Sequence, residues 1–267
     1  MTVRGSAQTV PIPAGYGYGR PPRRWWVRLL RVAIGCVVTV VCLSLLAFGG
    51  LLLISPSVGN APQIAAAQDA SHHVAYPGPP VPAKFTAALV ATEDHRFGGE
   101  PGIDPFAVVK AAGGAIVHTN NPGGATIYQQ LAKMLYTPGQ HGVSVEAKQV
   151  ALAVKLRYSY SGSEILQMYG DVAYYGNGYY GIQSASCGYF GVMPAELSWP
   201  QAAMLAGVVN GPSIDDPVTN PVNGRAREAH VIGRLVATGT LTQAEADQAL
   251  AVPVSAMLAH GGQGCGA

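Results

Sequence analysis

The chain has 267 residues, of which 49% are hydrophobic, and its formal net charge is only +2. This composition is sufficient for one sizeable domain and an additional segment. The near-neutral charge argues against nucleic acid as a partner, because binding to a phosphate backbone requires a strongly basic surface.

Positive charge is concentrated at the amino terminus. Six of the sixteen Lys and Arg residues precede residue 32, and this stretch contains no acidic residue. Residues 1–31 are therefore expected to form a basic cytoplasmic tail. Residues 32–54 follow as an uncharged apolar run, which at about 1.5 Å per residue spans the roughly 30 Å of a bilayer core.

This charge asymmetry predicts a single-pass protein of the cell membrane, with the amino terminus in the cytoplasm and everything beyond residue 55 outside. A cleaved signal peptide is the alternative. The apolar run is longer than the usual signal-peptide core of about 7–15 residues, which favours an uncleaved anchor.

The remaining chain divides into a linker, a domain and a tail. Residues 55–83 are rich in Pro and Ala and are expected to form a stalk, and residues 251–267 are expected to form a carboxy-terminal tail. Residues 84–250 alternate apolar runs with Gly and Pro breaks and lack the period-two alternation of half-buried strands. This pattern predicts a mostly helical domain, with helices near residues 84–95, 104–118, 125–136, 144–158, 161–172, 178–188, 194–208, 222–238 and 242–250.

The cysteine and histidine residues give only weak indications of a disulfide bridge or a metal site. Cys36 and Cys42 fall within the apolar run, so only Cys187 and Cys265 would face an oxidising space. A bridge between these two is possible, but no spacing pattern supports one. The histidine pair at residues 72–73 lacks a third ligand at useful spacing, and we interpret it as part of the stalk rather than as a metal site.

An acidic pair ends the first helix of the predicted domain. Glu93 and Asp94 arrive at its carboxyl end, where a helix carries partial negative charge. An acid placed against this charge and beside another acid should have a raised pKa, which favours a proton acceptor working near neutral pH. The alternative is a solvated pair that Arg96 neutralises.

A second motif begins at a pair of glycines, whose backbone can turn tightly. The helix that follows places polar side chains on one face at positions i, i+3, i+4 and i+7, which are Thr126, Gln129, Gln130 and Lys133. Backbone N–H groups at the start of this helix could hold an anion, and the ammonium of Lys133 could meet a phosphate. Such a face also occurs on helices for which it serves solubility alone.

These residues resemble the motifs of the family-51 peptidoglycan glycosyltransferases, the polymerase module of class A penicillin-binding proteins and of monofunctional transglycosylases. The first family motif, Glu-Asp-x-x-Phe-x-x-His-x-Gly, is matched at Glu93, Asp94, Phe97 and Gly102. The second, Gly-Gly-Ser-Thr-Ile-Thr-Gln-Gln-Leu-x-Lys-Asn, is matched at Gly123, Gly124, Thr126, Ile127, Gln129, Gln130, Leu131 and Lys133. The resemblance extends over roughly residues 83–237.

The resemblance implies a lysozyme-like helical fold and the polymerisation of lipid II at the outer face of the cytoplasmic membrane, with release of undecaprenyl pyrophosphate. By position, Glu93 is the catalytic base, and Lys133 and Lys148 match the family's contacts to the diphosphate. The other implied substrate-binding positions are Asp94, Phe97, Thr126, Gln129, Gln130, His141 and Gln149. Lipid II, the nascent glycan strand and the membrane are the implied partners.

The chain departs from the family at several positions. Gln149 stands where the family has its second carboxylate, and an amide can neither act as a base nor hold a divalent cation by charge. His141 replaces a phosphate-binding Arg, Glu100 replaces the first-motif His, and Glu146 replaces a Lys. No cofactor or metal site is firmly implied, although a divalent cation is possible.

Three functions remain open. The chain is a divergent but working polymerase, a catalytically weakened relative that binds lipid II or acts as a scaffold in cell-wall assembly, or an enzyme that cleaves glycan strands. Cleavage requires a second carboxylate about 5–9.5 Å away, for which Asp94 or Asp104 would have to serve. The retained Glu93 and the polar helix face favour polymerisation.

Two further expectations concern partners and aromatic residues. The sequence contains neither a Ser-x-x-Lys nor a Lys-Thr-Gly motif, so crosslinking of the strands is expected to come from a separate transpeptidase or cell-division protein. Tyr174, Tyr175, Tyr179 and Tyr180 could line a sugar groove, but aromatic clusters in Gly-rich turns more often pack locally.

Overall fold

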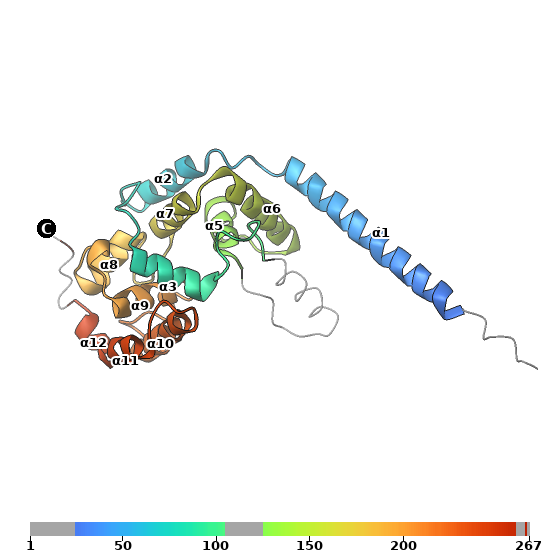
Figure 1. Ribbon diagram of the computed structural model, residues 1–267. Helices are drawn as coiled ribbons and strands as arrows, with labels where there is room; N and C mark the ends of the chain where they lie inside the picture. Colours follow the sequence, from blue (N-terminus) through green and yellow to red (C-terminus); the bar gives the residue numbers. More distant parts are fainter. Residues whose placement is uncertain (1–24, 105–124, 260–264, 266–267) are drawn as a thin grey trace, which may run out of the picture. The chain divides into compact units, whose positions relative to one another are not determined.

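The structure, a computed structural model, describes residues 25–104, 125–259 and 265 (Figure 1). The helix expected near 104–118 lies almost entirely outside these ranges, and so does the glycine pair at 123–124. Within the described ranges the regular elements are helices, apart from one isolated antiparallel bridge. The mostly helical fold expected from the sequence is therefore confirmed.

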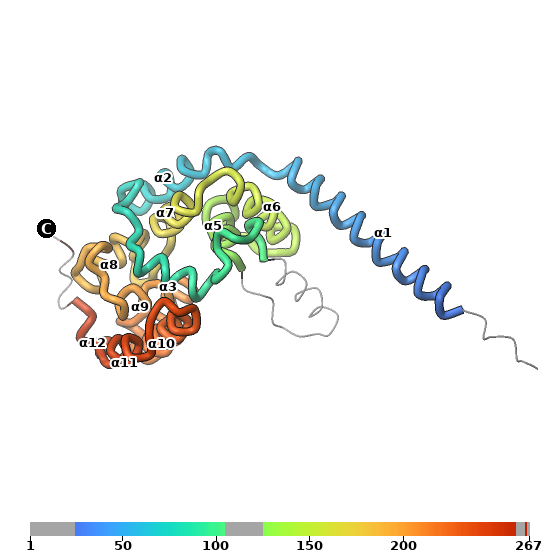
Figure 2. The backbone as a smooth tube through the Cα atoms, in the orientation of Figure 1, coloured from blue at the N-terminus to red at the C-terminus, as the bar shows by residue number. Residues whose placement is uncertain are grey.

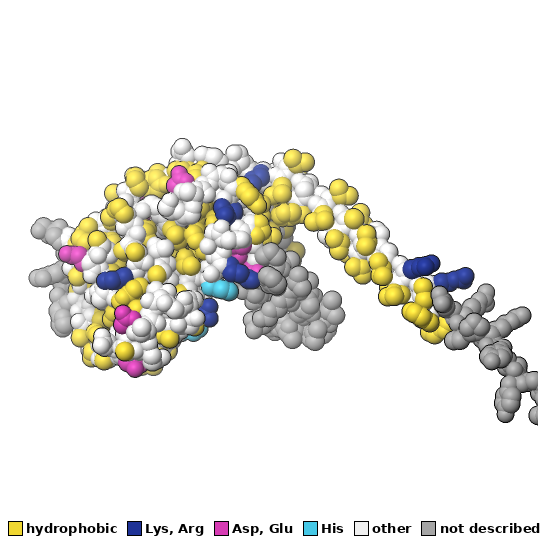
Figure 3. Space-filling model, in the orientation of Figure 1, with side chains coloured by type: hydrophobic (Ala, Val, Ile, Leu, Met, Phe, Trp, Pro, Cys, Tyr) yellow, Lys and Arg dark blue, Asp and Glu magenta, His cyan; other side chains and the backbone are white. Residues whose placement is uncertain are grey.

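The amino-terminal element is α1, Trp25–Ile54, whose mean hydropathy of 2.7 and length of 30 residues suffice to cross a bilayer. The helix already includes residues 25–31, ahead of the apolar run at 32–54, and these residues contain no helix breaker. Figure 3 shows hydrophobic side chains along α1 and basic side chains near its amino-terminal end. The expected apolar amino-terminal helix is confirmed. The chain forms two compact units, and the boundary between them lies within α1, between Ala47 and Phe48.

The second unit contains the remaining helices. Most of them match the expected ranges closely, but the helix expected at 178–188 begins only at Ile182, because Gly178 and Gly181 adopt positive φ values of 82° and 77°. The helices are α2 Ala61–Ser71, α3 Ala83–Glu93, α5 Ile127–Tyr136, α6 Val143–Ser159, α7 Gly162–Val172, α8 Ile182–Phe190, the 3₁₀ helix η1 Pro194–Glu196, α9 Trp199–Val208, α10 Pro221–Ala237, α11 Gln243–Ala251 and α12 Val254–Met257.

The interpretation of residues 55–83 as a stalk is wrong for α2. This helix packs against α7 and α5, and its Ala61 and Ala65 are fully buried in the hydrophobic core. Asp69 is also buried, at 1% exposure. Alanine at these positions lets the helix axis approach its neighbours closely, so the composition that resembled a linker is that of a tightly packed helix.

Two groups of closely packed helices within this unit position the site. One group contains α3, α9 and α10, and the other contains α5, α6 and α7 (Figure 2). Helix α9 is apolar on all sides, and its residues Ala202–Val208 are buried throughout, as expected of a central helix.

The loop after α3 joins the two groups and is fixed by hydrogen bonds. The carboxylate of Asp94 accepts a bond of 3.1 Å from the backbone N–H of Ile127, at the start of α5. Arg157 of α6 donates to the carbonyl oxygen of Gly98 over 2.6 Å. Gly102 has a φ of +87°, and a Cβ there would lie 2.6 Å from the carbonyl oxygen of Ala153, so only glycine fits between the loop and α6. The loop therefore sets the position of the end of α3.

Candidate active site

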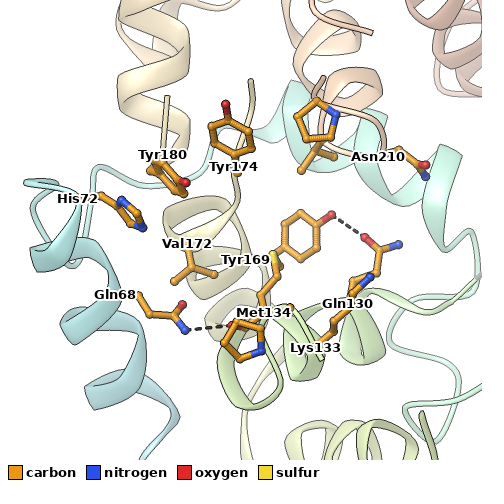
Figure 4. A pocket seen from close by; sticks show the side chains of 14 residues that line it. Gln68, His72, Gln130, Lys133, Met134, Tyr169, Val172, Tyr174, Tyr180 and Asn210 are labelled. Carbon is orange, nitrogen blue, oxygen red and sulfur yellow. Dashed lines mark hydrogen bonds between the residues drawn. The ribbon is translucent and has the colours of Figure 1, made fainter. Parts of the chain in front are cut away.

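A cavity of about 830 Å³ opens between α2, α5, α7 and the chain that follows α9 (Figure 4). Its volume lies within the roughly 300–1,000 Å³ of small-molecule sites. The side chains with polar groups that line it are Gln68, His72, Gln130, Lys133, Tyr169, Tyr174, Tyr180 and Asn210.

Gln130 and Lys133 reach this cavity as neighbours on α5, as their spacing of three residues predicts. The hydroxyl of Tyr169 donates to Oε1 of Gln130 over 2.7 Å, and Nε2 of Gln130 donates to the carbonyl oxygen of Ala125 over 3.3 Å. The amide of Gln130 is thereby fixed in one orientation. The same Nε2 also donates to Glu93 over 3.0 Å.

Glu93 is the last residue of α3, and three side chains hold its carboxylate. Besides Gln130, Asn210 donates to both carboxylate oxygens, over 2.8 and 3.0 Å, and Arg227 donates to Oε1 over 3.0 Å. The Glu93 side chain is only 7% exposed. Since Gln130 and Asn210 both line the cavity, the carboxylate lies directly behind two groups that face it.

The side chains of Thr126 and Gln129 cap the amino-terminal end of α5. Thr126 is the N-cap: its Oγ1 accepts from the backbone N–H of Gln129 over 3.2 Å, and Oε1 of Gln129 accepts from the backbone N–H of Thr126 over 3.1 Å. This reciprocal pair is a capping box, which satisfies N–H groups that a helix start leaves without partners. Neither side chain lines the cavity, so the geometry does not support the substrate contacts expected of them.

Asp94 has Glu100, rather than Glu93, as its acidic neighbour. Burial raises the pKa of Asp94, which is 6% exposed. Burial, and then the charge of Asp94, raise the pKa of Glu100 to about 7. The expectation that an acid in this motif has a raised pKa is thus met at Asp94, but Asp94 faces the start of α5 and not the cavity.

The remaining predicted site residues lie away from the cavity lining. The ring of Phe97 stacks on Tyr128 with centroids 4.9 Å apart, which makes it a packing residue. His141 is exposed before α6, and Lys148 is half-buried within that helix. Gln149 donates to the hydroxyl of Thr137 over 2.8 Å, next to the cavity-lining Pro138.

Several residues in or next to the cavity were not assigned to the site from the sequence. Asn210 is a polar residue between the apolar α9 and a Gly-Pro turn, and this placement is the signal that marks it. Arg227 lies in the second turn of α10 and reaches Glu93 without lining the cavity. His72, interpreted above as part of a stalk, lines the cavity. Of the four tyrosines considered for a sugar groove, Tyr174 and Tyr180 line the cavity, whereas Tyr175 and Tyr179 do not.

Two other features bear on the chemistry of the domain. Among the described residues, no cluster of three or more His, Cys, Asp or Glu side chains could hold a metal ion. A disulfide joins Cys187 to Cys265, whose Cα atoms are 4.9 Å apart, so the bridge left open by the sequence is formed.

Comparison with known proteins gives a consistent result. The family described as "Transglycosylase" matches residues 61–236. Penicillin-binding protein 2a of Streptococcus pneumoniae is 37% identical over 174 residues, which cover 64% of this chain and 23% of that protein. Penicillin-binding protein 1A of Aquifex aeolicus is 34% identical over 180 residues, covering 66% and 24%. The chain thus spans about a quarter of the length of these relatives.

A protein of Cupriavidus necator, whose name describes it as a candidate transglycosylase, is 33% identical over 174 residues, covering 65% of this chain and 75% of that one. Among solved structures, penicillin-binding protein 1A of Haemophilus influenzae matches 50% of this chain and 17% of its own, with 25% identity and a TM-score of 0.34. From the family match over most of its second unit, this chain belongs to the transglycosylase family, the family-51 glycosyltransferases that its motifs resemble.

Proposed function

We propose that this protein is a peptidoglycan glycosyltransferase, which polymerises lipid II at the outer face of the cytoplasmic membrane and releases undecaprenyl pyrophosphate. The observation that carries the proposal is the carboxylate of Glu93, which Asn210 and Gln130 hold directly behind the lining of a cavity that Lys133 also lines, and which Arg227 binds as well. This transfer requires a base close to the acceptor hydroxyl and a cation close to the leaving group.

The reaction forms one glycosidic bond for each bond that it breaks. The C4 hydroxyl oxygen of the acceptor lipid II attacks the anomeric carbon of the growing strand, and Glu93 takes the hydroxyl proton. The bond from the anomeric carbon to the pyrophosphate oxygen breaks, and undecaprenyl pyrophosphate leaves with the electron pair. Lys133 is the cavity cation suited to the charge that develops on this leaving group.

Glu93 needs a route to the acceptor hydroxyl, because its carboxylate already has three donors. Gln130 can release it while keeping its bonds to Ala125 and Tyr169. The incoming hydroxyl would then replace the amide as a donor to the carboxylate, and Arg227 would keep the carboxylate in place. Catalytic hydrogen bonds are often completed only when substrate binds.

The location of the domain agrees with a membrane-bound substrate. Helix α1 is suited to a single-pass anchor with a cytoplasmic amino terminus. The disulfide between Cys187 and Cys265 supports an extracytoplasmic domain, because such bonds persist mainly in oxidising compartments. A separate transpeptidase is the expected partner for crosslinking the strands.

A catalytically weakened lipid II-binding relative is the second candidate. It is favoured by Gln149, which removes the family's second carboxylate, and by the exposed His141 in place of an Arg. Strand cleavage has less support. Asp94 is bound to the start of α5 and Asp104 is paired with Arg96, so neither is placed to serve as the second carboxylate.

Purified full-length protein in detergent, supplied with labelled lipid II, tests the proposal. We expect glycan strands from the wild type and none from Glu93→Gln. Asp247→Asn, which changes an exposed acid that accepts a hydrogen bond from Gln243 on α11, is the matched control and should keep full activity. Equal product from Glu93→Gln and wild type would remove Glu93 from the mechanism, and a wild type that binds lipid II without extending it would favour the weakened relative.

A further inference from the structure

One end of the cavity is a wall of three aromatic side chains. The rings of His72 and Tyr180 are stacked, with centroids 3.5 Å apart and planes 6° from parallel. Tyr174 continues the wall, with its centroid 4.7 Å from that of Tyr180 and a tilt of 35°. In Figure 4 these rings lie on the opposite side of the cavity from Asn210 and Gln130, the two residues that hold Glu93.

The backbone holds His72 in place. The residue ends α2, and its N–H donates to the carbonyl oxygen of Asp69 over 3.0 Å. The next residue, His73, has a φ of 59°, in the left-handed region, and Val74 donates to the same Asp69 oxygen over 2.8 Å. This turn presents the imidazole to the cavity although the residue itself is exposed.

A close backbone approach brings the tyrosines to His72. Gly181 has a φ of +77°, and a Cβ there would lie 2.9 Å from the carbonyl oxygen of Asp171 and 3.3 Å from Val74. The segment after α2 and the segment before α8 can therefore touch only because position 181 is glycine. A bridge between Tyr174 and Tyr180 closes the second segment into a tight turn. The wall is thus built before any ligand arrives.

We infer that this wall, including His72, binds a sugar ring of the glycan strand at a distance from the reacting bond. A pyranose ring has an apolar face of C–H groups that suits an aromatic surface, and an edge of hydroxyl and acetamido groups that needs polar partners. The cavity supplies both, because Gln68 lines it beside the rings: its Nε2 donates to the carbonyl oxygen of Met134 over 3.0 Å, and its Oε1 can accept from a sugar hydroxyl. An isoprenoid chain has no donor for this oxygen.

This inference rests on the proposed function, because it places the reducing end of the strand at Glu93 and an earlier sugar at the wall. Its consequence is retention of the strand between additions. Losing a stacking partner weakens binding by up to about tenfold, given the free energies typical of aromatic contacts. A strand held less firmly dissociates sooner, so the products should become shorter while the first addition remains possible.

Two substitutions of His72 separate the loss of ring stacking from a general loss of stability. His72→Ala removes the ring, whereas His72→Phe keeps a flat ring of similar size. Both change an exposed side chain, so the melting temperature should stay that of the wild type. In full-length Glu93→Gln protein, which cannot turn over, calorimetric titration with the soluble tetramer of N-acetylglucosamine should show about tenfold weaker binding for His72→Ala and binding within about twofold for His72→Phe.

The polymerisation assay gives the second readout. With Glu93 intact, His72→Ala should give shorter strands than the wild type, and His72→Phe should restore their length. Unchanged tetramer affinity and strand length in His72→Ala would overturn the sugar subsite while leaving the polymerase intact. Weaker binding of a short prenyl pyrophosphate, with tetramer affinity unchanged, would assign the wall to the lipid chain and also overturn it. A wild type that makes no strands yet loses tetramer binding on His72→Ala would refute only the polymerase.

Discussion

The guanidinium of Arg227 lies 3.0 Å from the carboxylate of Glu93, although 134 positions separate the two residues in the chain. The contact offsets an unfavourable electrostatic interaction, because the carboxylate of Glu93 lies at the carboxyl end of α3, where the helix itself is partially negative. A second arginine of α10, Arg234, donates to the carbonyl oxygen of Ala91 over 3.0 Å. Helix α10 thus neutralises the end of α3 at two points.

Arg227→Gln should lower the rate of strand formation about ten- to hundredfold, because a charge-assisted contact contributes about 1.5–3 kcal/mol. Without the guanidinium, the carboxylate of Glu93 keeps only Asn210 of the two partners that would remain when Gln130 is displaced, and it loses the charged one. The initial rate of lipid II consumption, measured per folded molecule, checks this expectation.

Arg234→Gln is the matched control for this prediction. It removes a contact between the same two helices but leaves the carboxylate of Glu93 untouched. It should lower the melting temperature and change the rate per folded molecule by less than about threefold. Equal rate losses in the two arginine variants would mean that Arg227 acts only through the stability of α3.

The helices of the domain could largely be predicted from sequence, because apolar runs ended by Gly and Pro have few alternatives to a helix. The error at α2 came from treating composition as a substitute for packing. Ala65 resembles a linker residue in sequence and becomes a core residue only when α7 lies against it, and nothing local to residues 61–71 encodes that contact.

The candidate site was predictable only in part, for a related reason. Gln130 and Lys133 share one helix face, so their spacing places them together. Asn210 meets Glu93 across 117 positions, and no local pattern carries that information. Thr126 and Gln129 are the opposite case, since Thr-x-x-Gln is the spacing of a capping box and their structural role could have been read directly.

Glu100→Gln should make the stability of the protein less sensitive to pH. The ordinary pKa of 4.5 is raised to about 7 in the folded protein, by burial first and then by the charge of Asp94. Between these values the folded chain keeps a proton that the unfolded chain releases, so the free energy of unfolding falls as the pH rises through this window. The amide carries no such proton, and the melting temperature of the variant should fall less between about pH 5 and pH 8.

Glu245→Gln provides the comparison for this measurement. Glu245 is an exposed acid whose pKa is lowered by hydrogen bonds from Thr242, so it stays ionised across the same window in both states. Its variant should follow the pH dependence of the wild type. A Glu100→Gln profile parallel to the wild type would show that the buried acid pair does not control this loss of stability.

Gln149→Glu should raise polymer yield about two- to thirtyfold, since a charged contact contributes about 0.5–2 kcal/mol more than a neutral one. The site can accept the charge, because the hydroxyl of Thr137, which now accepts from Gln149, can rotate to donate to a carboxylate. Titration of lipid II turnover compares the two proteins. An unchanged yield, together with unchanged lipid II binding, would favour the weakened relative as the function of this chain.

The segment that follows α1 is held by side chains of α6 and its end. The ammonium of Lys155 donates to the carbonyl oxygens of Ser55 and Pro56, over 2.6 and 3.0 Å, and the hydroxyl of Tyr160 donates to that of Val58 over 2.8 Å. These contacts hold residues 55–58 against α6 and its end within the second unit, in a stretch that the sequence had predicted to be part of a stalk. They belong to the same compact unit as the cavity.

Lys155→Met should loosen this connection while preserving the apolar stem of the side chain. The contacts are partly exposed, so their loss should cost about 1 kcal/mol and speed hydrogen exchange at residues 57–61 about fivefold. Lys84→Met is the matched control, because Lys84 also donates to a backbone carbonyl, that of Leu197, but in another part of the domain. Its exchange at residues 57–61 should equal that of the wild type. If Lys155→Met also leaves exchange there unchanged, other contacts such as that of Tyr160 hold the segment, and the ammonium contacts contribute nothing to its order.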